Sequence, residues 1–138
     1  MKYFGTILRG GEPDEAAAEK AYSMMCETIA TERERLGGDW VIAQAVPTRR
    51  LRDCIRKALG PDLMFVTLSV SRDLQLKRYL GRSGSNAEKD ENFYKTFNKF
   101  YNAFEPVHID EPFAFDYKIN HDLTPEEICR HILTFSQK

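Results

Sequence analysis

The sequence lacks the features of several specialised classes of protein. Its 138 residues contain no apolar run near the ~18 residues of a membrane span, and no signal-peptide pattern opens the chain. Its three cysteines, Cys26, Cys54 and Cys129, are far apart and form no CxxC pair, which argues against a disulfide framework and a zinc site. The formal net charge of -1 gives little electrostatic drive toward nucleic acid. We therefore expect a cytoplasmic protein that binds neither membranes nor nucleic acid and has no metal site.

Charge is unevenly distributed along this nearly neutral chain. Residues 49–82 contain nine Lys and Arg but only three Asp, whereas residues 105–127 contain seven acidic residues and one lysine. The basic region could bind an anionic ligand, or it could pair with the acidic region. The pattern leaves both interpretations open.

Hydrophobic periodicity and turn residues predict alternating helices and strands in a single domain over residues 1–138, with a helical segment at 1–37 and strand–helix repeats at 38–138. The stretch 2–9 fits either a short helix or a strand. The first half is expected to contain a helix from Pro13 to Leu36, a buried strand at 40–46, a helix after Thr48 and a second buried strand at 63–70. A helix after Ser71 should follow, then a polar loop or lid at 81–92 and an aromatic helix over 93–104. The last elements are a strand at 115–119 and a helix that begins at the capping box of Thr124. This order predicts an α/β fold with a parallel, three-layer αβα sheet.

Side-chain spacing also predicts which faces are buried. The first long helix is expected to bury Ala17, Ala21, Met24, Met25, Thr28 and Ile29. The helix after Thr48 is expected to bury Leu51, Ile55, Ala58 and Leu59, while Arg49, Arg52 and Arg56 project elsewhere and Asp53 pairs with a neighbouring arginine. We expect a core face made by the rings of Phe93, Phe97, Phe100, Tyr101 and Phe104. The histidines are expected at the surface or at helix caps: His108, His121 and His131.

Four segments in a fixed order carry a resemblance to a known family. They are GDWVIAQAVPTRRLRD at 38–53, GPDLMFVTL at 60–68, KRYLGR at 77–82 and FEP at 104–106. Together they resemble the second half of gluconate-kinase-like and adenylate-kinase-like P-loop small-molecule kinases, over roughly residues 38–135. The resemblance implies a parallel αβα sheet, a basic helix with an Arg-Asp pair, and an arginine-bearing helix that leads into a lid.

The resemblance also implies roles for particular residues. Gln44 lies near the carboxyl end of an expected strand, where open α/β sheets bind ligands. Within the family's pattern, Arg49 and Arg52 would border the acceptor substrate, Arg78 and Arg82 would meet the transferring phosphates, and Asn120, His121 and Asp122 would border the nucleotide base. Two departures bear on the acceptor, because family members place a small hydroxyl residue where Ala45 stands and a lysine where Arg49 stands.

The string GxxxxGK[ST], which supplies the phosphate cradle, its lysine and a magnesium ligand, does not occur in this sequence. The acidic residue that family members carry after their second strand also has no counterpart. We therefore expect a kinase-like domain that is non-catalytic alone and retains at most weak binding of a nucleotide or small anion, with no catalytic residues. The alternative is an active phosphotransferase that uses ATP and Mg²⁺ at an atypical phosphate site completed by another chain.

The missing front part has a consequence for folding. In the family, the strand before the phosphate loop lies between the counterparts of 40–46 and 63–70. Without it, these two strands must pair directly or leave open edges that recruit another chain. We expect a homo-oligomer formed through sheet edges.

Overall fold

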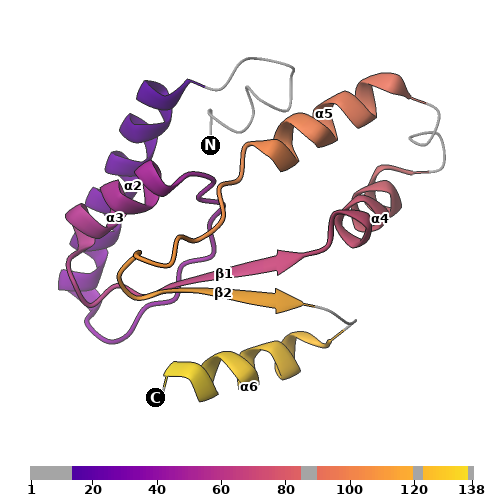
Figure 1. Cartoon of the computed structure of the whole chain (residues 1–138). Coiled ribbons are helices and arrows are strands. Elements are labelled where there is room, and N and C mark those ends of the chain that lie inside the picture. The colour runs from indigo at the N-terminus through magenta and orange to yellow at the C-terminus, as the bar shows by residue number, and fades with distance from the viewer. Residues whose placement is uncertain (1–13, 85–89, 120–122, 137–138) are drawn as a thin grey trace. The chain divides into compact units, whose positions relative to one another are not determined.

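The computed structural model describes residues 14–84, 90–119 and 123–136, and this part of the chain has an α/β fold (Figure 1). It contains five helices and two strands in the order α2, α3, β1, α4, α5, β2, α6. Contacts divide the chain into two units that alternate along the sequence. Unit 1 comprises Met1–Leu63 and Glu91–Pro106, and unit 2 comprises Met64–Asp90 and Val107–Lys138.

Unit 1 contains the long helix α2 (Glu15–Leu36), which ends at the predicted glycine but begins after Asp14, whereas the sequence predicted a start at Pro13. The Asp14 carboxylate caps the first turn by accepting hydrogen bonds from Ala16 N at 3.0 Å and Ala17 N at 3.2 Å. Gly37 ends the helix with a φ of 67°, a left-handed value that costs glycine little. The expected helix is therefore confirmed, and the predicted short stretch at 2–9 lies outside the described residues.

The buried face of α2 differs from the prediction by about one residue. Ala18, Tyr22, Cys26 and Ile29 are buried, whereas Met24 is 60% exposed. These four positions follow a helical stripe rotated by about 100° from the expected one. Tyr22 explains the shift, because its large ring is fully buried and its hydroxyl donates to Ala45 O.

Helix α3 (Arg49–Leu59) packs against α2 and completes most of the core of unit 1. As predicted, Thr48 caps it, with Oγ1 accepting from Leu51 N at 3.3 Å, and Gly60 ends it. Leu51 and Ile55 are buried, as predicted, but Ala58, which was expected on the same inner face, is exposed and Leu59 is only half-buried. The aromatic helix α5 (Glu91–Asn102) also belongs to this unit.

Only part of the aromatic face of α5 is buried. Phe97 is 3% exposed and stacks on Tyr101 with ring centroids 6.0 Å apart. Phe104 contacts Phe100 at 5.6 Å but lies past the end of the helix and is 37% exposed. The expected core face is therefore centred on Phe97 and weakens toward the C-terminal end.

The strand expected at 40–46 is absent, and this prediction is wrong. The segment has no regular secondary structure and joins no sheet, and Val41 is 99% exposed. A strand needs a neighbour for its backbone groups, and the described part of unit 1 contains no other strand. The segment is held instead at its C-terminal end, where Tyr22 bonds to Ala45 and Pro47 is fully buried.

Unit 2 contains the sheet, in which β1 (Phe65–Val70) pairs in parallel with β2 (Ala114–Ile119). The register runs from Phe65 opposite Ala114 to Val70 opposite Ile119. The strands expected at 63–70 and 115–119 and their parallel direction are confirmed, whereas direct pairing of 40–46 with 63–70, one of the two alternatives raised by the sequence, is not found in the described residues. The described sheet has two strands, and the strand that pairs with β1 is β2, which comes later in the chain.

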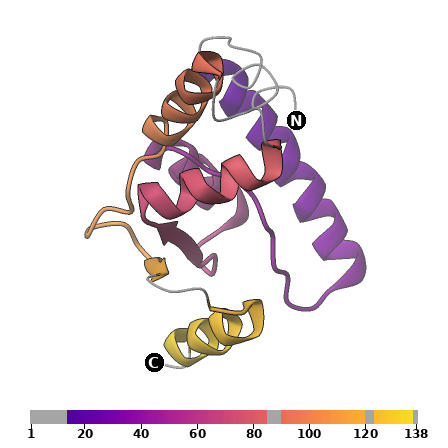
Figure 2. The same ribbon diagram turned by 90° about the vertical axis from the view of Figure 1, so that its right-hand side faces the viewer.

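Two helices flank the strands within unit 2. Ser71 caps α4 (Arg72–Ser83) by accepting from Leu74 N at 3.2 Å, as predicted. The C-terminal helix α6 (Pro125–Ser136) lies below both strands in the two views of Figures 1 and 2. Because α4 extends to Ser83 and α5 begins at Glu91, the polar loop is shorter than the lid expected at 81–92.

The predicted capping box of α6 is confirmed. Thr124 N donates to Glu127 Oε2 at 2.7 Å, and Glu127 N donates to Thr124 Oγ1 at 3.2 Å. One turn further along, His131 contacts the hydroxyl of Tyr117 on β2. None of the helices in the described ranges is long and apolar enough to cross a membrane.

Candidate functional site

The residues expected at the acceptor side lie at one place in unit 1, which we call the α3 junction. It consists of Pro47, Arg49, Arg52, Glu105 and Pro106, where the chain leaving α5 meets the start of α3. Arg52 is 2% exposed, and its guanidinium donates to the carbonyls of Glu105 and Pro106, each at 3.1 Å. Glu105 N in turn donates to Pro47 O at 2.6 Å. Backbone and side-chain hydrogen bonds therefore fix the start of α3 to the segment that follows α5.

The carboxylate of Glu105 closes the N-terminus of α3. Its Oε2 accepts from Arg49 N at 3.1 Å, while Thr48 Oγ1 satisfies Leu51 N. Unpaired N–H groups at a helix N-terminus, with the positive end of the helix dipole, form a ready anion-binding site. Here a carboxylate of the chain itself occupies part of that site. An acceptor anion would have to displace Glu105 to bind at the same amide.

The remaining arginines of α3 pair with carboxylates of the same unit. Asp53 lies 3.5 Å from Arg49 Nε and 2.6 Å from Arg56 Nη1, which confirms its predicted role as a structural partner. Arg50 pairs with Glu19 and, at 2.9 Å, with Glu15. Both carboxylates raise the pKa of Arg50 above its ordinary value, and Glu19 has the larger effect. The ion pairs described for Arg49, Arg50 and Arg56 are thus made with carboxylates of α2 and α3.

The sequence-based site residues of unit 1 have different surroundings. Arg52 was expected to project away from the core, and this is wrong, because it is buried and bonded to two carbonyls. Arg49 is half-buried and meets both Glu105 and Asp53. Gln44 is half-buried in the segment 40–46 and does not stand at a strand end, because no strand forms there. Arg49 and Arg52 thus lie at one junction, as expected, but they bond to groups of the protein itself.

The predicted phosphate-binding residues belong to unit 2. Arg78 and Arg82 lie on α4, four residues apart and therefore on one side of the helix, and both are exposed. Lys77 is also exposed beside them. Helix α4 thus carries three exposed cationic side chains between Lys77 and Arg82. The expected base-binding residues Asn120, His121 and Asp122 lie outside the described residues.

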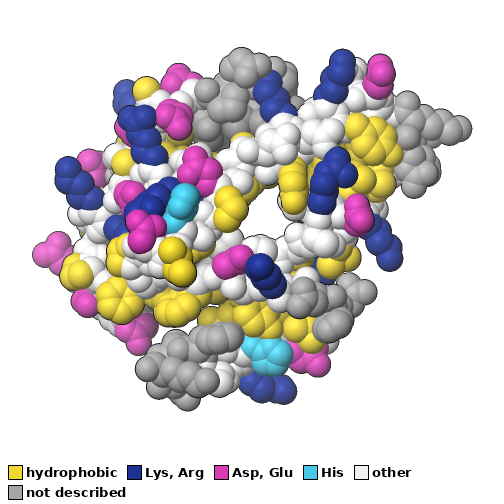
Figure 3. All heavy atoms as spheres, viewed as in Figure 1, with side chains coloured by type: hydrophobic (Ala, Val, Ile, Leu, Met, Phe, Trp, Pro, Cys, Tyr) yellow, Lys and Arg dark blue, Asp and Glu magenta, His cyan; other side chains and the backbone are white. Residues whose placement is uncertain are grey.

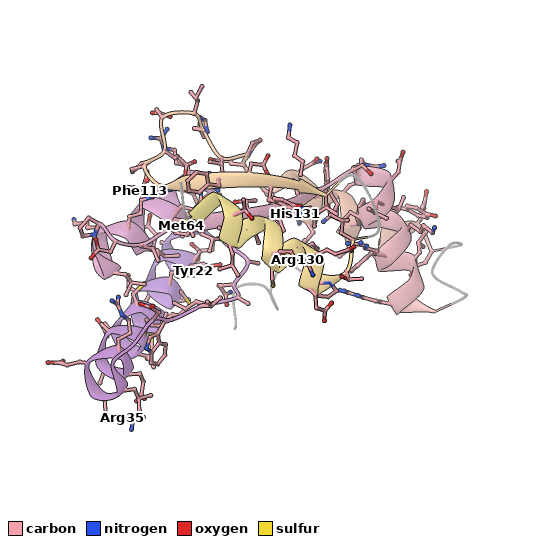
Figure 4. All side chains as sticks on the ribbon, turned by 90° about the horizontal axis from the view of Figure 1, so that it is seen from below. Tyr22, Arg35, Met64, Phe113, Arg130 and His131 are labelled. Atoms are coloured by element: carbon pink, nitrogen blue, oxygen red, sulfur yellow. The ribbon has the colours of Figure 1, made fainter. Side chains whose placement is uncertain are left out.

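A small apolar pocket lies within unit 2 between the sheet and α6. It is lined by Met64, Val66, Phe115, Asp116, Tyr117 and Ile132 and has a volume of ≈ 90 Å³. Small-molecule sites span about 300–1,000 Å³, so this pocket has room for only a few water molecules. Figure 4 shows Met64 and Phe113 close together at the start of the strands, with His131 further along α6. We assign the pocket to imperfect packing and not to ligand binding.

A wider hollow of ≈ 430 Å³ lies within unit 1 beside Arg33, Glu34, Gly37 and Leu59. Its walls come from the C-terminal turns of α2 and α3. Helix C-termini expose carbonyl groups and carry the negative end of the dipole, so they disfavour phosphate. This hollow therefore does not replace the missing phosphate cradle.

Other chemistry-bearing residues do not form a site in the described ranges. No group of three His, Cys, Asp or Glu side chains that could hold a metal occurs there. Cys26 is buried, and this burial, helped by the nearby Cys54, raises its thiol pKa above the ordinary 9.0, which disfavours the reactive thiolate. His108 is exposed, in line with the predicted surface role.

Sequence reasoning missed two residues that shape unit 1. Glu105 was noted only as part of the Glu-Pro helix end, and its bond to Arg49 spans 56 positions, which no local pattern signals. Tyr22 lay one position outside the expected apolar stripe, although its size could have favoured it for the core. Both contacts are non-local, so only the folded chain reveals them.

Comparisons with models of protein families, with curated proteins and with solved structures find no match to this chain. The kinase resemblance therefore depends on the residues of this sequence alone. What the chain does must be inferred from those residues and from the geometry of its two units.

Proposed function

We propose that this chain is a non-catalytic relative of P-loop small-molecule kinases, which binds a phosphate-bearing anion weakly and does not transfer a phosphoryl group on its own. The observation that carries the proposal is the closed α3 junction. Arg52 and the first amide of α3, where the resemblance expects the acceptor, are bonded to Glu105 and Pro106 of the same unit.

The order of elements supports the kinase-like part of the proposal. A strand at 65–70, an arginine-bearing helix, a second helix and a parallel strand at 114–119 follow the order that the resemblance implies. The unpaired segment at 40–46 fits as well, because its neighbour in the family is the strand that precedes the phosphate loop. Among the residues that the structure describes, no strand pairs with 40–46.

The lack of catalysis follows from electrostatics. Phosphoryl transfer needs preorganised donors and a metal around the developing charge, and loss of one comparable donor costs about 10²–10³ in rate. This sequence contains no GxxxxGK[ST] string, so the lysine, the amide cradle and the hydroxyl ligand to magnesium are all missing from it. The residues that remain do not fit a bound Mg²⁺–ATP complex.

Weak anion binding is assigned to α4. Arg78 and Arg82 present two cationic groups from one side of the helix, and both are exposed to solvent. Ion pairs in such a setting contribute little, so we expect a dissociation constant of about 1 mM that weakens with salt. The ligand is any di- or triphosphate of suitable size, with little base selectivity.

The test is a calorimetric titration with ATP, with and without Mg²⁺, at low and at physiological salt. The proposal expects weak binding that does not need Mg²⁺ and is reduced by Arg78→Ala and by Arg82→Ala. Lys57→Ala, which removes an exposed cation from α3 of unit 1, is the matched control and should bind like the unmodified chain. Micromolar binding that requires Mg²⁺ would overturn the proposal in favour of an active phosphotransferase, and no binding at all would refute the anion-binding role.

A further inference from the structure

Two of the three cysteines belong to helices that pack on each other within unit 1. Cys26 lies on α2 and Cys54 lies on α3, and these two helices are in contact (Figure 1). Both cysteines are free thiols, and Cys26 is buried whereas Cys54 is half-buried. Neither takes part in the α3 junction or belongs to the cationic side chains of α4. The pair is therefore independent of the residues discussed for anion binding.

Helices α2 and α3 run in the same direction. At their N-terminal ends, Arg50 forms ion pairs with Glu15 and Glu19, which join the first turn of α3 to the first turns of α2. Figure 3 shows basic and acidic side chains interspersed over the region of these helices. At their C-terminal ends, the last turns of both helices line the same hollow. Contacts at both ends thus match N-terminus with N-terminus and C-terminus with C-terminus.

Cys54 occupies the middle of the row of α3 that faces α2. Arg50, Cys54 and Ala58 follow one another at intervals of four residues and therefore lie along one side of the helix. The first residue of this row reaches α2 through its ion pairs, and the last lines the hollow that α2 shares. Cys54 faces α2 as well, because it lies between these two points on the same side.

Cys26 occupies the corresponding place on α2. It is 2% exposed and belongs to the buried stripe that includes Tyr22 and Ile29. Ala30, one turn further along, lines the shared hollow, as Ala58 does on α3. Each cysteine therefore lies one turn before an alanine at the hollow, and the two thiols are at the same level of the parallel pair.

Facing positions on packed helices lie within the reach of a disulfide. Packed helix axes are about 8–10 Å apart and Cα atoms lie about 2.3 Å from each axis, so directly facing Cα atoms approach to within about 5.5 Å. A disulfide joins Cα atoms about 4.4–6.8 Å apart. Burial raises the pKa of the Cys26 thiol, and Cys54 raises it further, which requires the two sulfur atoms to be near each other.

We propose that Cys26 and Cys54 form a reversible disulfide that locks α2 onto α3 when the chain meets a low-molecular-weight disulfide of the glutathione type. Cys54, the less buried thiol, attacks the oxidant as a thiolate, forms a mixed disulfide and releases one small thiol. The Cys26 thiolate then attacks the Cys54 sulfur and releases the second. The chain loses two protons and two electrons, and the oxidant is reduced to two thiols.

This proposal goes beyond the proposed function, since it involves no phosphate or nucleotide. Both helices belong to unit 1, so the bridge depends on no contact between the units and on no second chain. The reaction is therefore intramolecular, and its rate should not depend on protein concentration.

Oxidised glutathione tests the bridge on the unmodified chain. After incubation at mildly alkaline pH and alkylation of the remaining thiols, peptide mapping without reduction should show a link between Cys26 and Cys54. Cys129, the exposed thiol, should carry glutathione instead. Conversion of the mixed disulfide into the bridge should become faster as pH rises toward and beyond 9.0, because the buried Cys26 must lose its proton first.

Three variants separate the two steps of the reaction. Cys54→Ser should leave Cys26 as a free thiol, because the buried sulfur has lost the residue that first takes up the oxidant. Cys26→Ala should stop the reaction at glutathione-bound Cys54. Cys129→Ser is the matched control and should form the bridge as the unmodified chain does. Circular dichroism of each variant checks that the fold is retained.

The bridge should also stabilise unit 1. It closes a loop of about 30 residues, so the thermal midpoint of the oxidised chain should lie about 5–10 °C above that of the reduced chain. Fluorescence of Trp40, which belongs to unit 1, follows the transition. Dithiothreitol should reverse the shift, because it reduces the bridge.

Several results would overturn the proposal. Glutathione that stays on Cys54 of the unmodified chain while Cys26 remains free would show that the thiols do not meet, and so would reaction at Cys129 alone. A link from Cys54 to Cys129 would assign the wrong partner. A bridge that forms only in denaturant, or a thermal midpoint that does not rise, would show that the folded helices do not hold the two thiols in position for a lock.

Discussion

The guanidinium of Arg52 donates to the backbone carbonyl of Glu105 at 3.1 Å, although 53 positions separate the two residues. The same arginine also donates to Pro106 O, and the Glu105 carboxylate accepts a hydrogen bond from Arg49 N. A buried cation is tolerated when its donors are matched by acceptors, and two carbonyls provide them here. The start of α3 and the end of the α5 segment are therefore fixed to each other by Arg52, within unit 1.

Arg52→Ala should lower the free energy of unfolding of unit 1 by about 3 kcal/mol, because a buried cation and its hydrogen bonds to two backbone carbonyls are lost. Trp40, the single tryptophan and a member of unit 1, provides the fluorescence signal for a urea titration. Arg50→Ala is the control, since its ion pairs are exposed, and it should shift the transition much less. Equal shifts for the two variants would show that the junction does not depend on Arg52.

Tyr22→Phe should cost about 1 kcal/mol, the net contribution of one hydrogen bond. The fully buried ring stays in place, but Ala45 O loses the hydroxyl that holds the segment 40–46. We therefore expect faster proteolysis and faster amide exchange around 40–46, measured by mass spectrometry. Tyr94→Phe on α5 serves as the control; if it loosens the same segment to the same degree, the anchoring role of Tyr22 is wrong.

Glu127→Gln should remove a pH-dependent part of the stability of α6. Hydrogen bonds from Thr124 N and from the Thr124 side chain lower the pKa of Glu127 below its ordinary 4.5. A lowered pKa in the folded state gives stability that is present above 4.5 and is lost as pH falls through the folded value. The thermal midpoint of the unmodified chain should thus exceed that of Glu127→Gln at neutral pH, and the gap should close in acid. Glu126→Gln is the neighbouring control, and a gap independent of pH would contradict the capping role.

The three thiols should react in an order set by burial. Cys129 is exposed, Cys54 is half-buried and Cys26 is buried with a raised pKa. A disulfide reagent at mildly alkaline pH should therefore modify Cys129 first and Cys26 last, as peptide mapping would show. Denaturant should abolish the difference. Rapid labelling of Cys26 in the folded chain would contradict the packing of α2 on α3.

Local signals predicted the helix boundaries well. Gly37 at the end of α2, Thr48 at the start of α3 and the Thr124–Glu127 capping box all act within a few residues of the chain. Their effect depends on backbone groups that are near in sequence, so the local sequence is enough to predict where these helices begin or end. The start of α2 was less accurate, because a helix from Pro13 was expected and Asp14 caps one that begins at Glu15. The parallel direction of 65–70 and 114–119 also followed from the alternation of elements, although their being neighbours did not.

Predictions that needed a distant partner were less successful. The segment 40–46 is apolar enough for a strand, but a strand forms only where another strand offers hydrogen bonds. Likewise, the buried position of Arg52 depends on carbonyls more than fifty residues away, which helical periodicity could not indicate. The surroundings of Arg52 and the strand at 40–46 were thus predicted wrongly for the same reason, because both depend on a partner that is distant in sequence.

Phosphate release tests the central claim most directly. The chain should be incubated with ATP, Mg²⁺ and a panel of small hydroxylated acceptors, and phosphate transfer measured against buffer. We predict no turnover above the uncatalysed rate, because the sequence supplies no phosphate cradle and the α3 junction is closed by Glu105. Turnover that Arg78→Ala abolishes would contradict the account and identify the chain as a working phosphotransferase.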